Sequence, residues 1–269
     1  MTAVKGSGPE DALEQSDRSA ADAGDGEDCG RSAADGRAND YDAFAEAYAA
    51  ENETSLANAY YERPAMLALA GDVSDRRVLD AGCGSGPLSA LLRDRGAVVT
   101  GLDVSAGMLA IARRRLGDDV ALQVADLKHP LPFDDGAFDL VTASLVLHYL
   151  EDWGPTLAEF RRVLTPGGRL ISSVDHPIVA YTIFDPRPDY FATTSYTFEW
   201  TFGGRSVPMK FWRKPLHAMV DAFAAAGLHI KSIDEPQPDP AAREIYPDGF
   251  ERLATRPTFM FFVVEAPLP

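Results

Sequence analysis

The chain has few cysteines, a shortage of basic residues and no long apolar run. Cys29 stands in a polar stretch and Cys83 in a glycine-rich turn, and these are the two cysteines among 269 residues. This pattern predicts neither a disulfide framework nor a zinc site. Lys and Arg number 25 against 41 Asp and Glu, a formal net charge of -16. Nucleic acids and anionic membranes are bound through basic side chains, so neither is expected as a partner.

The sequence also lacks the apolar segments that direct or hold a chain in a membrane. No run approaches the roughly 18 apolar residues of a membrane-spanning helix. The N-terminus turns polar after Gly6 and has no apolar signal-peptide core. We therefore expect a cytoplasmic protein, either a monomer or a homodimer.

Two regions of different composition follow one another. Residues 1–38 are rich in Ala, Asp, Gly and Ser and nearly free of large apolar side chains. Such a stretch cannot bury enough apolar surface to offset the entropy of ordering, so it is predicted to be disordered. Residues 39–269 are predicted to form a single domain with a full hydrophobic core.

Within this domain, short apolar strands alternate with helical patterns. Strands are predicted over 77–80, 97–103, 120–125, 138–144, 169–174, 229–233 and 259–265. Helices are predicted over 41–50, 64–71, 86–95, 105–116, 155–164 and 215–226. The alternation predicts an α/β fold with a Rossmann-like, seven-stranded, mostly parallel sheet and helices on both faces.

An aromatic-rich segment, 176–214, interrupts this alternation after the fifth strand. It is too aromatic for a linker and too irregular for a βα unit. It forms either a lid over a substrate site or additional core, and the lid is the favoured interpretation. A lid excludes water and shapes an apolar site, for which Tyr190, Trp200 and Trp212 are the pocket candidates.

The first strand leads into a glycine-rich turn that reads Val-Leu-Asp-Ala-Gly-Cys-Gly-Ser-Gly over 78–86. Glycines allow a tight turn and a close approach of the backbone to a ligand. The glycines alone are a weak signal, because many nucleotide-binding folds share them. However, Asp80 ends the first strand and Asp103 ends the second, where a carboxylate can accept hydrogen bonds from both ribose hydroxyls.

Residues 78–86 resemble motif I of class I methyltransferases that use S-adenosylmethionine (SAM). The segments 131–139 and 164–170 resemble those that precede the fourth and fifth strands of the UbiE-like, type 11 group, and the similarity covers roughly 41–175. The resemblance implies SAM as cofactor and S-adenosylhomocysteine as product. It also implies a set of cofactor-binding residues: Tyr41, Tyr48, Asp80, Ala81, Gly82, Gly84, Gly86, Asp103, Val104, Met108, Asp126, Leu127 and Ser144.

Methyl transfer from SAM is an in-line displacement in which the enzyme mainly aligns the reactants. A base is needed where the acceptor must lose a proton. His148, after the fourth strand, is the leading base candidate, and the neighbouring Tyr149 is expected on the substrate side. His176, after the fifth strand, is the second candidate; Asp175 would orient it only if the backbone bends there. The His, Cys, Asp and Glu residues do not show the spacing of a known metal-binding motif, so no metal is predicted.

Other functions stay open at this point. A SAM-binding enzyme of natural-product synthesis that does not methylate, such as a cyclase, can keep the same motif. A nicotinamide-dependent oxidoreductase is less favoured, because Asp80 is unusual there and G-x-G-x-x-G is absent. A non-catalytic binding module is also possible in principle. The acceptor is expected to be a small molecule, with the methylated atom O, N or C.

Overall fold

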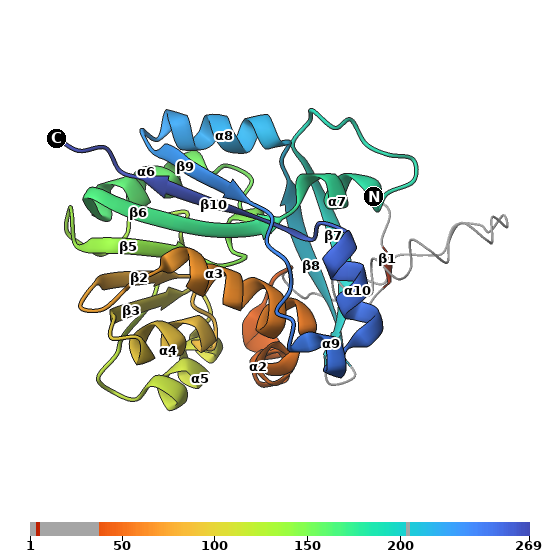
Figure 1. Cartoon of the computed structure of the whole chain (residues 1–269), viewed down its shortest axis with the longest axis horizontal. Coiled ribbons are helices and arrows are strands. Elements are labelled where there is room, and N and C mark those ends of the chain that lie inside the picture. The colour runs from red at the N-terminus through yellow and green to blue at the C-terminus, as the bar shows by residue number, and fades with distance from the viewer. Residues whose placement is uncertain (1–3, 6–37, 203–204) are drawn as a thin grey trace, which may run out of the picture.

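The computed structural model describes residues 4–5, 38–202 and 205–269, so nearly all of the tail predicted to be disordered lies outside the described residues. A seven-stranded sheet with helices on both faces forms the body of the molecule (Figure 1). The strands of this sheet are β2 (Arg77–Ala81), β3 (Val98–Asp103), β4 (Ala121–Val124), β5 (Phe138–Ala143), β6 (Leu164–Asp175), β9 (His229–Asp234) and β10 (Phe259–Glu265).

The strand order is β4-β3-β2-β5-β6-β10-β9, and β10 runs antiparallel to both of its neighbours while the remaining pairs are parallel. The predicted seven-stranded, mostly parallel Rossmann-like sheet is therefore confirmed. From β2 the chain continues to β3 and β4 on one side of β2, and it then returns to β5 on the other side of β2. This reversal is a topological switch point, where open α/β sheets bind ligands beyond the carboxyl ends of their strands.

Different sets of helices cover the two faces of the sheet. One face carries α6 (Gly154–Val163) and α8 (Leu216–Ala225), whose Phe160 and Phe223 are fully buried. The other face carries α3, α4 and α10, with Met66 and Leu92 in its core. The remaining helical bounds are α2 (Ala45–Thr54), α3 (Arg63–Ala70), α4 (Pro87–Asp94), α5 (Ala106–Leu116), α7 (Pro177–Thr182), α9 (Ala242–Ile245) and α10 (Pro247–Thr255).

The first predicted helix, 41–50, is broken rather than continuous. A 3-10 turn, η2 (Tyr41–Ala43), precedes α2, and Phe44 between them leaves helical geometry. A π-helical segment, η3 (Asn58–Glu62), then leads directly into α3. Such π segments are rare and often lie at functional sites, because the extra residue redirects side chains.

The aromatic insertion forms regular structure that the sequence analysis missed. Residues Thr194–Phe202 (β7) and Arg205–Arg213 (β8) form an antiparallel hairpin, and β7 also pairs with the short β1 (Val4–Lys5). Every second residue of β7 is aromatic from position 196 to 202, a period that places these side chains on one face. That alternation is a strand signal, and the segment forms a β-hairpin rather than a βα unit.

The hairpin is tied to the start of the domain. Asn39, at a positive φ of 66°, donates from its side chain to the Lys210 carbonyl and accepts from the Lys210 N–H at 2.7 Å. Its own N–H donates to the Pro208 carbonyl. Phe44 then packs into the aromatic cluster on the hairpin's inner face. The insertion and the segment before α2 therefore form one unit beside the sheet.

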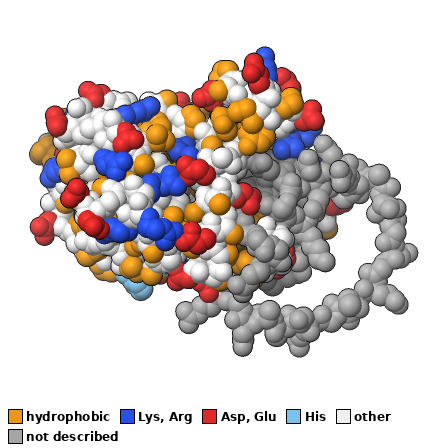
Figure 2. All heavy atoms as spheres, turned by 90° about the horizontal axis from the view of Figure 1, so that it is seen from below, with side chains coloured by type: hydrophobic (Ala, Val, Ile, Leu, Met, Phe, Trp, Pro, Cys, Tyr) orange, Lys and Arg blue, Asp and Glu red, His pale blue; other side chains and the backbone are white. Residues whose placement is uncertain are grey.

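The surface mixes charges of both signs. Figure 2 shows acidic and basic side chains interspersed over one face of the molecule. Ion pairs contribute to this pattern, for example Arg115 of α5 with Glu53 of α2 at 2.5 Å. Over residues 4–5, 38–202 and 205–269, no helix combines the length and apolar character needed to cross a membrane.

Candidate active site

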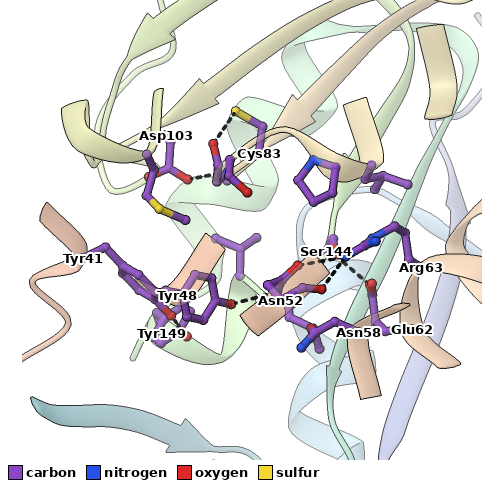
Figure 3. A pocket seen from close by; sticks show the side chains of 18 of the residues that line it. Tyr41, Tyr48, Asn52, Asn58, Glu62, Arg63, Cys83, Asp103, Ser144 and Tyr149 are labelled. Atoms are coloured by element: carbon purple, nitrogen blue, oxygen red, sulfur yellow. Dashed lines mark hydrogen bonds between the residues drawn. The ribbon is translucent and has the colours of Figure 1, made fainter. Parts of the chain in front are cut away.

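A cavity of about 520 Å³ lies at the carboxyl ends of β2, β3 and β5. The glycine turn after β2 and the segment after β5 form its floor, and α2, η3 and the β7–β8 hairpin contribute side chains from other sides. Figure 3 shows three tyrosines, Tyr41, Tyr48 and Tyr149, on one side of the cavity, with Asp103 nearby. Glu62, Arg63 and Ser144 gather on the other side.

The glycine turn depends on backbone geometry that other residues adopt only with strain. Gly82 has a φ of +77°, and a Cβ built on it would lie 2.6 Å from Val146 Cγ2. Its N–H donates to the Leu102 carbonyl at 2.8 Å, which fixes the turn against β3. Glycine is required here both for left-handed geometry and for close packing of the turn on the segment after β5.

Asp103, at the end of β3, faces the cavity beside this turn. Its carboxylate accepts from the backbone N–H groups of Gly84 and Ser105, each at 2.9 Å. Burial raises the pKa of the Asp103 carboxyl, and these two hydrogen bonds act in the opposite direction. The carboxylate is thus held in one orientation at the cavity wall, where it can accept hydrogen bonds from a pair of neighbouring hydroxyls.

Two further carboxylates are buried at the cavity. Asp80 accepts from Ser89 Oγ at 2.6 Å and from Thr142 Oγ1 at 2.8 Å, and burial raises its pKa. Glu62, at the end of the π segment, is 3% exposed and accepts from Ser144 Oγ and Ser173 Oγ. Burial raises the pKa of Glu62 as well.

The charge balance of the lining favours a cationic ligand. The described residues that line the cavity include five carboxylates but one cationic side chain, that of Arg63. A buried charge is costly without a partner, so an electropositive molecule would complete the site. SAM fits this donor set, because its sulfonium and ammonium groups match the carboxylates and its single carboxylate matches Arg63. A dinucleotide carries a pyrophosphate, which this lining would repel.

Aromatic side chains form a chamber at the other end of the cavity. Tyr48 and Trp200 are stacked with ring planes 5° apart, and Tyr149 lies 5.2 Å from Phe211. Tyr41 Oη and Tyr149 Oη share a hydrogen bond of 2.5 Å. Burial raises the pKa of both of these phenols well above the ordinary value, so they are neutral. The chamber is therefore apolar with a few hydroxyl groups.

His148 is buried in the wall of this chamber, on the short turn η4 (Leu147–Tyr149). Its Nδ1 lies 3.4 Å from Asp175 Oδ2, and Tyr196 Oη donates to the same carboxylate oxygen at 3.0 Å. Burial lowers the pKa of His148 and the nearby Asp175 partly offsets this. From the sequence, Asp175 was a possible partner of His176, whereas in the structure Asp175 lies against His148.

Most of the predicted cofactor and substrate residues come together at this cavity. The predicted residues in its lining are Tyr41, Tyr48, Asp80, Gly82, Gly84, Asp103, Val104, Met108, Ser144, His148, Tyr149 and Trp200. Gly86 and Ala81 lie behind the lining, since Gly86 is the residue directly before α4 and Ala81 is fully buried at the end of β2.

The other predicted residues lie outside the cavity lining. Asp126 caps a turn by accepting from the Lys128 N–H, and Leu127 is buried beside it. His176 caps α7, and its Nε2 bonds Glu235 Oε1 at 2.8 Å.

Two aromatics proposed for the pocket also lie outside its lining. The ring of Tyr190 contacts that of Tyr181. Trp212 packs under Lys210. Strand alternation turns Trp212 to the face of β8 opposite Phe211, so Phe211 takes the place in the cavity that had been expected for Trp212.

Several lining residues were missed from the sequence. Asn52, Asn58, Glu62 and Arg63 come from α2, η3 and α3, and Phe198 and Phe211 come from the hairpin. A signal existed for Glu62 and Arg63, because this charged pair interrupts the apolar stretch 59–70. Charged residues within a buried segment indicate a function or a partner.

Comparison with known proteins agrees with this geometry. The family described as "Methyltransferase domain" matches residues 79–172. A demethylmenaquinone methyltransferase of Thermus thermophilus is 44% identical over 108 residues, which are 38% of this chain and 49% of that protein. The chain thus spans about half the length of that curated relative.

Solved structures share the fold over a larger part of the chain. A SAM-dependent methyltransferase from Mesorhizobium loti is 26% identical with a TM-score of 0.61, covering 80% of this chain and 99% of that one. The cyclase SpnF is 20% identical with a TM-score of 0.53, covering 77% and 81%, which shows a common fold. Residues 79–172 are thus similar to a methyltransferase domain, and most of the chain shares its fold with a SAM-dependent methyltransferase.

Proposed function

We propose that this protein transfers a methyl group from SAM to a small-molecule acceptor bound in the aromatic chamber. The observation that carries the proposal is one cavity lined both by buried carboxylates and by a cluster of aromatic rings. SAM supplies an electrophilic methyl group on a sulfonium. The protein's contribution is to align the acceptor and exclude water, which is worth up to about 7–11 kcal/mol in favourable cases.

Each wall of the cavity has a proposed role in holding SAM. Asp103 accepts hydrogen bonds from the ribose, with Val104 and Met108 beside it. Arg63, oriented by the Asn52 side chain at 2.8 Å, pairs with the carboxylate of the methionine moiety. Glu62 supplies negative charge for the ammonium group. Contact of Asp126 and Leu127 with the adenine stays a prediction, because neither residue lines the cavity.

The domain limits and partners belong to the same proposal. We take residues 39–269 as the catalytic domain, with 176–214 as an insertion that closes the acceptor chamber. The mixed surface charge in Figure 2 and the overall acidity support a small-molecule acceptor rather than a nucleic acid. Monomer and homodimer are both compatible with this site.

Two alternatives make different predictions. A cyclase that keeps SAM bound without consuming it would release no S-adenosylhomocysteine. A nicotinamide-dependent oxidoreductase would bind NAD, which the acidic lining disfavours. The His148–Asp175 pair in the chamber supports a reaction in which a proton is removed, and methyl transfer to a protonated acceptor is one.

The test is calorimetric titration with SAM of the intact protein and of Asp103→Asn. The amide keeps the shape but loses the charge, and a charge-assisted hydrogen bond contributes about 1.5–3 kcal/mol, so SAM affinity should fall roughly 10- to 150-fold. Asp94→Asn is the matched control. Asp94 is exposed at the end of α4, and its substitution by Asn removes the same charge away from the cavity. Equal affinity of the two variants, with unchanged melting temperatures, would exclude the assigned ribose site.

A further inference from the structure

His148 lines the acceptor chamber and has an unsatisfied ring nitrogen. The side chain is 5% exposed, and its Nε2 has no hydrogen-bond partner within the described part of the chain. Buried polar atoms without a partner are rare in folded proteins, and each one calls for a ligand or a functional reason. Because His148 lines the cavity, a polar group of the bound acceptor is the partner that the structure leaves to be supplied.

The surroundings of Nδ1 fix what Nε2 can do. Nδ1 lies 3.4 Å from the carboxylate oxygen Oδ2 of Asp175. The Asp175 N–H, also 3.4 Å from Nδ1, is the competing donor. The negative charge of the Asp175 carboxylate outweighs the long contact from the neutral N–H and favours a proton on Nδ1. In that tautomer Nε2 carries a lone pair and accepts a proton from the acceptor molecule.

Asp175 is itself held in place. Tyr196 Oη donates to its Oδ2 at 3.0 Å, and the Asp175 backbone is paired with Phe259 in the sheet. The titratable groups that face His148 are therefore Asp175 from β6 and Tyr149 from its own turn, with Tyr196 of β7 acting through Asp175. This places His148 as the proton acceptor and Asp175 as its positioning residue.

The remaining walls of the chamber select the acceptor's charge and shape. They are the rings of Tyr48, Trp200, Tyr149, Phe198 and Phe211, a set suited to a flat apolar molecule. An anionic acceptor would meet the Asp175 carboxylate. Among the described lining residues the one Lys or Arg is Arg63, and its guanidinium is bonded to Asn52. An uncharged aromatic ring therefore fits this lining better than a carboxylate.

We infer that the acceptor is an uncharged aromatic compound with a phenolic hydroxyl, and that His148 removes the hydroxyl proton during methyl transfer. This inference rests on the proposed function. In the step, the phenol oxygen forms a bond to the methyl carbon as the bond from that carbon to sulfur breaks. The sulfonium becomes the neutral sulfide of S-adenosylhomocysteine. The phenol proton moves to His148 Nε2, and the imidazolium loses it to water once the products leave.

The experiment uses 2-naphthol as probe, with 2-naphthoate and 2-naphthylmethylamine as anionic and cationic ring-matched compounds. S-adenosylhomocysteine release is followed in the full-length protein, in His148→Gln and in His176→Gln. His176→Gln is the matched control, because that histidine is outside the cavity lining and bonds Glu235. At neutral pH, His148→Gln should lose about 100-fold or more in turnover, in the range that general base catalysis contributes, while SAM affinity stays unchanged.

Two further measurements separate proton transfer from a structural effect. Above the ordinary phenol pKa of about 10 the probe ionises by itself, so the turnover of His148→Gln should recover there. Asp175→Asn should move the acid limb of the wild-type pH profile to lower pH, because Asp175 raises the pKa of His148. Nitrogen NMR should find the proton of the neutral ring on Nδ1.

Three results would overturn the inference. They are methylation of the anionic or cationic probe in preference to 2-naphthol, full activity of His148→Gln at neutral pH, and no turnover of 2-naphthol by a protein that binds SAM. The last result leaves the proposed function intact, since SAM binding is measured separately. If the wild-type protein does not bind SAM, the proposed function itself is contradicted.

Discussion

Alanine at position 82 should be far more costly than alanine at an ordinary left-handed glycine. A residue with a side chain at a φ of +77° loses about 1–2 kcal/mol from backbone strain. The added Cβ would also lie 2.6 Å from Val146 Cγ2 and 3.0 Å from Val146 Cβ. A β-branched side chain cannot easily turn away, and such overpacking costs about 1–3 kcal/mol. The two effects together predict a loss of about 2–5 kcal/mol.

Gly227→Ala isolates the backbone effect. Gly227 follows α8 at a φ of +73°, and an added Cβ there meets no heavy atom within 4 Å. Replacing Gly by Ala lowers the conformational entropy of the unfolded chain by the same amount at both positions. This effect therefore cancels when the stabilities of the two variants are compared. Gly227→Ala should therefore lose only the strain of about 1–2 kcal/mol.

Urea unfolding of the two variants measures the difference directly. A Val146→Ala background removes Cγ2, the contact at 2.6 Å, but keeps the Cβ at 3.0 Å, so there the excess cost of Gly82→Ala over Gly227→Ala should shrink without vanishing. The reasoning is refuted if Gly82→Ala and Gly227→Ala are equally stable, or if Val146→Ala leaves the excess cost of Gly82→Ala unchanged.

Two other predictions concern buried polar groups of the site. Glu62→Gln keeps an oxygen for Ser144 and Ser173 but removes a buried charge, so the protein without SAM should become more stable while SAM binding weakens. Burial raises the pKa of Glu62 in the folded protein, so the unfolded chain releases this proton first as pH rises. The free energy of unfolding of the wild-type protein therefore falls as pH rises above the ordinary pKa of glutamate. Urea melts should show that Glu62→Gln is more stable than the wild-type protein at pH 7.5 and that this difference vanishes at low pH. Tyr41→Phe should destabilise the domain by about 1–3 kcal/mol, because the Tyr149 hydroxyl loses its 2.5 Å partner. Tyr149→Phe added to it should cost less than the two single changes together, and full additivity in thermal melts would contradict this coupling.

The sheet and the cofactor end of the cavity could be predicted from the sequence because their signals are local. Most strands of the sheet contain a short apolar run, and Asp80, the glycine turn and Asp103 stand directly at strand ends. In a parallel sheet, strand ends meet at one edge whatever the packing details. The sequence therefore predicts that these residues meet at one edge of the sheet, and in the structure they line one cavity.

The acceptor end could not be predicted in the same way, because it is assembled from segments far apart in the chain. Asp175 lies beside His148 across 27 positions, and Tyr41 bonds Tyr149 across 108. Neither contact follows from sequence spacing. The choice between Phe211 and Trp212 depends on the register of β8, which shifts every side chain to the other face when it slips by one residue.

The helical segment before the sheet shows a different limit. The sequence pattern suggested one helix over 41–50 and another from Pro64, but the structure inserts a π segment over Asn58–Glu62. This segment aims Glu62 at Ser144 and Ser173. A π turn has no characteristic residue pattern, so only the charged pair within an apolar stretch hinted at the site.

The most direct test of the central claim is to compare SAM and NAD as ligands of the intact protein by calorimetric titration. The charge of the cavity lining predicts that SAM binds with a stoichiometry of one and that NAD shows no measurable heat. Binding of NAD with equal or higher affinity, or no binding of SAM by the folded protein, would contradict the account.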